Sequence, residues 1–133
     1  MKQITRLMIN EFKIKELNMD FMGYALQKNE IYTYHHLIIP KRRGGPETRW
    51  NGAILCGRTS HPYLHLIEAK DYDIFCYITS EMIDLNVKGY LDIENIKNIH
   101  KVLDRFEKEH CNDRGKKGKL LIKEEYIRRR IKV

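Results

Sequence analysis

Hydrophobic residues recur along this chain with two different spacings, which together predict an α+β fold. Residues 31–39 and 50–56 are rich in β-branched and aromatic side chains, which favours strands, and residues 21–26 have the same character over a shorter stretch. Beyond about residue 70, apolar positions repeat every three or four residues, which is typical of amphipathic helices. We therefore expect a pair of strands followed by a helical region.

Residues with special backbone preferences mark the predicted boundaries. Pro40 ends the first long strand because proline cannot donate a ladder hydrogen bond, and Gly44-Gly45-Pro46 predicts a loop that closes residues 31–56 into a hairpin. Ser60 is expected to cap one helix and Asp92 a later one. The predicted parts are an N-terminal extension with weak helical signal (1–20), a hairpin-plus-helix core (21–70), a helical region (71–113) and a basic C-terminal segment (114–133).

The last of these parts is expected to contain a helix over residues 120–132. Its apolar residues, which are expected to face inward, are Leu121, Ile122, Tyr126 and Ile127.

Composition is that of a globular domain of ordinary size. The chain has 133 residues, of which 42% are hydrophobic and 32% charged. No apolar run approaches the roughly 20 residues that a membrane-crossing helix needs, and the N-terminus lacks the apolar stretch of a secretory signal. Cys56, Cys76 and Cys111 are odd in number and far apart, which favours reduced thiols. We therefore expect a cytoplasmic protein that does not enter membranes.

The net charge of +7 is concentrated at one end of the chain. Residues 114–133 contain nine lysines and arginines and two glutamates, so the first 113 residues are neutral overall. A strongly basic end favours an anionic partner such as nucleic acid, although a solvated basic tail has the same composition.

Four of the six histidines fall between residues 35 and 65. His61 and His65 are four residues apart, so on a helix both imidazoles can reach one metal ion. His35 and His36 lie on a predicted strand that the hairpin brings toward that helix. Each pair alone is weak evidence for a metal site, since surface histidines are common. Glu68 lies between His61 and His65 on a helical wheel, but it is more typical of a surface charge than of a fourth ligand. Together the two pairs indicate a metal site.

The order and spacing of these residues resemble the HNH endonucleases of the ββα-metal type. The chain has the pair His35-His36, then a proline and a Gly-Gly loop, then Asn51 fifteen residues after the second histidine. The His61-x-x-x-His65 helix opens ten residues after that asparagine. The resemblance covers about residues 21–70 and implies a ββα-metal core.

The resemblance also implies a role for each matching residue. His36 matches the general base that takes a proton from water, and His35, His61 and His65 match the ligands of one divalent metal ion. Asn51 matches the asparagine that hydrogen-bonds across the hairpin loop and holds the backbone of the base in place. The implied activity is a phosphodiester hydrolase that leaves 5′-phosphate and 3′-hydroxyl ends. Nitrogen ligands favour Zn²⁺, Ni²⁺ or Mn²⁺ over Mg²⁺, and all four remain candidates.

The implied substrate is DNA, which we expect to be double-stranded and held through its phosphates. A single protomer would nick one strand, and a homodimer would be needed to break both. The alternative is a non-catalytic nucleic-acid-binding module in which Glu68 or Cys56 completes a closed structural metal site. The expected nucleic-acid contacts are Lys41, Arg42, Arg43, Arg49 and Arg58.

Overall fold

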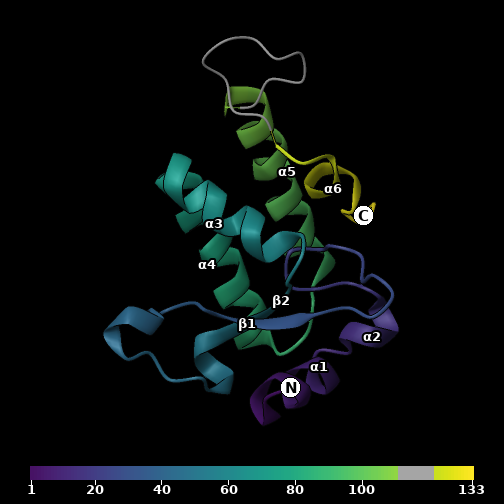
Figure 1. The fold of residues 1–133 in the computed structure, drawn as a ribbon, viewed down its shortest axis with the longest axis vertical. Coiled ribbons are helices and arrows are strands. Elements are labelled where there is room, and N and C mark those ends of the chain that lie inside the picture. The colour runs from purple at the N-terminus through teal and green to yellow at the C-terminus, as the bar shows by residue number, and fades with distance from the viewer. Residues whose placement is uncertain (111–121) are drawn as a thin grey trace.

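The computed structural model describes residues 1–110 and 122–133 and combines helices with strands, which confirms the predicted α+β class (Figure 1). Strands β1 (Tyr32–His36) and β2 (Gly52–Cys56) form an antiparallel pair, and two short 3₁₀ turns, Lys41–Arg43 and Arg49–Asn51, lie between them. The helices of the described residues are α1 (Gln3–Glu11), α2 (Ile14–Leu17), α3 (Ser60–Lys70), α4 (Tyr72–Lys88), α5 (Ile93–His110) and α6 (Glu124–Arg128).

The predicted hairpin is present, but its strands are shorter than the sequence pattern suggests. β1 ends early because the backbone N–H groups of Ile38 and Ile39 donate to the side chain of Asn51 instead of to a strand. β2 begins late because Arg49–Asn51 form a 3₁₀ turn. Side-chain hydrogen bonds therefore replace ladder hydrogen bonds at the end of the hairpin where the connecting loop begins and ends.

The strand predicted over residues 21–26 is wrong. This segment makes only isolated bridges to other parts of the chain, and it turns at Gly23, whose φ is 75°. The turn is stabilised by Asp20, whose buried carboxylate accepts hydrogen bonds from the backbone N–H groups of Met22 and Tyr24. The aromatic and apolar side chains that suggested a strand are buried here by an irregular turn.

Ser60 starts α3 but does not cap it, so that prediction is also wrong. The N-cap position belongs to Thr59, which makes no side-chain capping bond. The Ser60 hydroxyl donates to the Asp20 carboxylate and accepts from the backbone N–H of Cys56. Asp20 also accepts from that same N–H, and burial raises the pKa of its carboxyl group. Asp20 thus ties the end of β2 to the start of α3 and holds the helix against the hairpin.

The long helices pack on the hairpin and on one another. α3 and α4 contact β2, α4 also contacts α3 and α5, and α1 packs against both strands (Figure 1). Asp92 caps α5 as predicted, because its carboxylate accepts the backbone N–H of Glu94. Asp71 caps α4 in the same way through Ile74. Asp71 is also the residue that ends α3, so α4 begins directly after α3.

The C-terminal helix is shorter than predicted. α6 covers Glu124–Arg128, and the predicted residue Leu121 lies outside the described residues. Tyr126 is buried and its ring stacks on that of Tyr63, with the centroids 4.9 Å apart. Ile127 is 42% exposed, so its predicted inward orientation is wrong.

Buried side chains from all four predicted parts of the chain join one hydrophobic core. Met8, Ile54, Ile78 and Tyr126 are examples, one from each part. None of the helices in residues 1–110 and 122–133 has the length and hydropathy that crossing a bilayer requires.

Candidate metal centre

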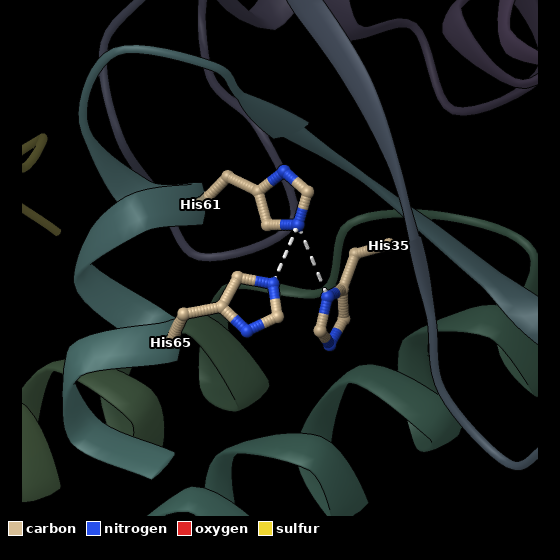
Figure 2. A group of neighbouring side chains, drawn as sticks. All are labelled: His35, His61 and His65. Atoms are coloured by element: carbon tan, nitrogen blue, oxygen red, sulfur yellow. Dashed lines mark hydrogen bonds between the residues drawn. The ribbon is translucent and has the colours of Figure 1, made fainter. Parts of the chain in front are cut away.

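Three of the predicted site histidines converge between β1 and α3. His61 and His65 lie one turn apart on α3, and His35 reaches them from near the C-terminal end of β1 (Figure 2). The His61 Nε2 atom is 3.1 Å from His65 Nε2 and 3.3 Å from His35 Nδ1. One ring nitrogen from each of the three lies within 4.8 Å of the others. The structure therefore brings together the three residues that the sequence proposes as ligands.

Hydrogen bonds on the far side of two rings determine which nitrogens carry lone pairs. The Thr33 hydroxyl donates its only proton to the backbone carbonyl of Leu55, 3.0 Å away. It must therefore accept from His61 Nδ1, which lies 2.7 Å from it. Glu68 Oε1 lies 3.2 Å from His65 Nδ1, and an ionised carboxylate can only accept. In both histidines the proton is on Nδ1, so both Nε2 atoms present lone pairs.

The Nε2 atoms of His61 and His65 face each other at 3.1 Å, and this arrangement fits a cation bound by both. Two neutral Nε2 acceptors at this distance repel each other unless a positive charge lies between them. Three nitrogens bound tetrahedrally at 2.0–2.1 Å from Zn²⁺ would lie roughly 3.3 Å apart, close to the two distances observed. Orientation of ligand imidazoles by a hydroxyl or carboxylate on the other nitrogen is common in metal sites. The residues present therefore fit one divalent ion.

His35 adds a second indication of a missing polar partner. Its side chain is buried, and its Nε2 atom has no hydrogen-bond partner among the described residues. This atom is not the one that approaches His61, since His35 Nδ1 does so, and an unpaired buried ring nitrogen is destabilising, which is consistent with a water or other polar partner at His35 Nε2.

The environment keeps the imidazoles of His35 and His61 neutral, which is the form that binds metals. Burial, together with smaller contributions from His61, His65 and His36, lowers the pKa of His35 to about 3. Burial also lowers the pKa of His61 to about 4, with smaller contributions from His65 and His36. At neutral pH neither ring has to lose a proton before it can donate its lone pair.

We expect the metal-free protein to lose stability as the pH falls below about 6.5, the ordinary pKa of histidine. In this range the unfolded chain takes up protons on His35 and His61, whereas the folded chain does not until about pH 3 and 4. Because the unfolded state binds more protons, the free energy of unfolding should fall by up to roughly 1.4 kcal/mol per pH unit for buried His35. Urea unfolding in EDTA at several pH values between 7 and about 5 measures this slope.

The variant His35→Gln provides the control, because it lacks the buried titrating group. Carboxylates that gain protons at the acidic end of the range do so in both proteins, so the difference between the two slopes isolates His35. Identical slopes would contradict the expectation.

His36 and His35 are neighbours on β1, so their side chains leave opposite faces of the strand. The His36 ring is half-buried and meets the Tyr34 ring edge-on, with the centroids 5.0 Å apart. It nevertheless lines the same pocket as the three clustered histidines and is close enough for its charge to lower the pKa of His61. The fourth histidine therefore lies beside the candidate ligands without belonging to their cluster.

Asn51 is fully buried and joins the two ends of the loop after His36. Its Oδ1 accepts from the backbone N–H groups of Ile38 and Ile39, at 3.0 and 2.8 Å. Its Nδ2 donates to the carbonyl oxygens of Ile39 and Pro46, each at 3.0 Å. All of its hydrogen-bonding capacity therefore holds the backbone that follows His36.

A pocket of about 710 Å³ opens over the cluster. β1, the following loop, the starts of α1 and α4, and α3 from its first turn to its last contribute to its walls. Of the predicted nucleic-acid contacts, Lys41 and Arg42 line this pocket. Lys2 also lines it and is paired with Glu47 at 2.6 Å.

The other three predicted cations are placed differently. Arg43 is exposed in the same 3₁₀ turn as Lys41 but is not a lining residue. Arg49 is held by the Glu11 carboxylate at 2.8 Å and stacks over the Phe12 ring, so it links the loop to α1. Arg58 lines a separate hollow beside α6. The structure therefore does not bring Arg49 or Arg58 to the pocket.

The two residues considered as a fourth ligand are occupied elsewhere. The Glu68 carboxylate lies beside His65 Nδ1, which is the ring nitrogen that does not face His61. Cys56 is buried with its Sγ 4.0 Å from the carbonyl oxygen of Ala25, and burial raises the pKa of its thiol. Within the described residues, the ligand group around His61 contains only the three histidines, which leaves its remaining side to the pocket.

Sequence reasoning missed Thr33, Tyr72 and Phe75 as residues of this site. Thr33 could have been found, because it precedes His35 by two and so shares its face of the strand. Tyr72 and Phe75 line the pocket only because α4 packs beside α3, which no local pattern reveals.

A second group of side chains with metal-binding atoms, Asp71, Glu109 and His110, lies where α5 approaches the start of α4. Here the carboxylate and imidazole pair with each other, since Asp71 Oδ2 is 2.7 Å from His110 Nε2. Asp71 also caps α4, so this group has a structural role that does not require an ion.

No protein-family model, no curated protein and no solved structure matches this chain.

Proposed function

We propose that this protein is a metal-dependent endonuclease that hydrolyses phosphodiester bonds in DNA, with a ββα-metal core of the HNH type. One observation carries the proposal: His35, His61 and His65 converge, with one ring nitrogen from each within 4.8 Å of the others, beside a pocket that His36 also lines. A site of this kind, with three protein ligands and one open side, is typical of catalytic metal centres, whereas structural sites are closed.

The three clustered histidines would hold the metal ion, with Thr33 and Glu68 orienting two of them. When bound, the ion supplies a Lewis acid that neutralises a phosphate oxygen and stabilises the leaving 3′-oxygen. Three imidazoles favour Zn²⁺, Ni²⁺ or Mn²⁺ over Mg²⁺.

His36 would act as the general base. It accepts a proton from a water molecule as the water oxygen forms a bond to phosphorus, and the bond from phosphorus to the 3′-oxygen breaks. An imidazole suits this role because its ring nitrogen can accept a proton and later release it. Asn51 holds the backbone that follows His36, so it acts as a positioning residue.

Lys41 and Arg42 would hold the phosphates that flank the scissile bond. Both are exposed, and both line the pocket. Contacts to phosphates provide affinity without reading base sequence, so we propose binding that weakens steeply with salt. A single site cuts one strand, and a homodimer would be required to cut both.

The alternative is a nucleic-acid-binding module with a structural metal ion. It requires a closed ligand shell, yet Glu68 faces the back of His65 and Cys56 is buried near Ala25. The open side of the cluster therefore favours the enzyme.

The proposal is tested by nicking of supercoiled plasmid. We expect the wild-type protein, after removal of metal with EDTA, to be inactive and to regain nicking when Mn²⁺, Ni²⁺, Zn²⁺ or Mg²⁺ is added separately. A His61→Ala protein purified in parallel reveals any contaminating nuclease. If the wild-type protein binds DNA and one metal ion but cuts with none of them, the structural-module alternative is correct instead.

A further inference from the structure

One wall of the pocket is aromatic, which the proposed chemistry does not require. Tyr72, the first residue of α4, is 62% exposed and lines the pocket. Its ring stacks on that of Phe75, with the centroids 5.6 Å apart and the planes inclined by 29°. Phe75 in turn meets the edge of the His35 ring at 6.4 Å. A continuous series of rings therefore leads from the candidate metal centre to an exposed aromatic face.

The remaining walls of the pocket differ in character from this one. Lys41 and Arg42 supply positive charge from the loop after β1, and the histidine cluster lies between β1 and α3. Ile38, which is 52% exposed, extends the apolar lining. A ligand complementary to this pocket has an anionic part near the cations and histidines and a flat apolar part near Tyr72.

We infer that this pocket takes up one unstacked nucleobase next to the scissile phosphate, with Tyr72 as the platform on which the base stacks. The preferred substrate is then DNA with an unpaired nucleotide at the cleavage site, such as a bulge or a single-stranded flap. The inference rests on the proposed nuclease function and narrows its substrate from continuous duplex to DNA with local single-stranded character.

Continuous duplex and unpaired DNA differ in which faces of their bases are exposed. Inside a continuous duplex the flat faces of the bases are covered by their neighbours, and only groove edges and the backbone are exposed. An unpaired base exposes its face and gains from stacking on an aromatic side chain, whatever its identity. Because the Tyr72 ring is backed by Phe75, it is already oriented before a base arrives.

The test measures binding in EDTA, where cleavage does not occur. Fluorescence anisotropy compares the full-length protein on three labelled DNAs of equal length: a continuous duplex, the same duplex with one unpaired 2-aminopurine, and a single strand. We expect the wild-type protein to bind the last two roughly tenfold more tightly than the duplex, within the range that stacking of one base provides. We also expect the 2-aminopurine fluorescence to be quenched by stacking.

Two variants at the platform and one matched control isolate its role. Tyr72→Ala should lose the preference and the quenching while binding duplex as before, and Tyr72→Phe should keep both. Tyr77→Ala removes another exposed tyrosine from the same helix, 44% exposed and not among the lining residues, and should behave as wild type.

Equal affinity of the wild-type protein for all three DNAs, or no binding to any, overturns the inference. An equal loss in Tyr77→Ala and Tyr72→Ala also overturns it. If the Tyr72-dependent preference is present but no metal supports cleavage, only the nuclease proposal fails. If the protein cuts continuous duplex as fast as bulged DNA and Tyr72→Ala changes neither rate, only the substrate inference fails.

Discussion

Replacing His36 with alanine is expected to lower the rate of plasmid nicking by about 10²–10⁴-fold, the usual contribution of a general base. Metal binding should be retained, because His36 lies outside the cluster formed by His35, His61 and His65. The measurement is the initial nicking rate at saturating metal, together with the number of metal ions bound per chain. A lower rate with unchanged metal content separates proton transfer from metal binding.

His110→Ala is the matched control for this substitution. It removes an imidazole that pairs with Asp71 and does not line the pocket. We expect it to nick at the wild-type rate. Equal nicking by His36→Ala and the wild-type protein would show that His36 is not the base.

Replacing His61 with alanine is expected to abolish nicking by weakening metal binding itself. His61 Nε2 is the central atom of the cluster, since it lies within 3.3 Å of a nitrogen from each of the other two rings. The loss of affinity should exceed roughly 100-fold, the upper end of what losing a supporting partner of a ligand costs. Competition for Zn²⁺ with a coloured chelator measures the affinity directly.

Thr33→Val provides a graded comparison, because it removes only the hydroxyl that holds His61 Nδ1. Valine is close to threonine in shape, so the strand should be preserved. We expect this variant to lose about 10–100-fold in metal affinity while still binding one ion. If His61→Ala binds Zn²⁺ as tightly as the wild-type protein, the cluster is not a metal centre.

Several parts of the fold could be predicted because their signals are local. The helical period after residue 70 predicted the buried face that contains Ile74 and Ile78, and the Asp92 cap depends on the N–H groups that immediately follow it. Helix periodicity and capping involve residues within one or two turns, so the sequence alone contains them.

The errors arose where distant partners decide the structure. Residues 21–26 have the composition of a strand, but the carboxylate of Asp20 accepts their N–H groups and turns the chain. Serine is a residue type that favours helix caps, but the hydroxyl of Ser60 donates to the same carboxylate instead. The nucleic-acid contact of Arg49 stays a prediction, but a distant partner also decides where this side chain lies, since Glu11 on α1 holds its guanidinium.

The sequence by itself therefore determined the α+β class and the hairpin, because each follows from the spacing of residues along one element or two adjoining elements, and the resemblance to HNH endonucleases supplied the set of His35, His61 and His65. Only the tertiary structure decided how those histidines are oriented, since Thr33 acts across the hairpin-to-helix contact. It alone also decided which side of the cluster is open and that Tyr72 stands beside it. Orientation and access depend on packing between elements, and a linear pattern of residue types does not encode which faces meet.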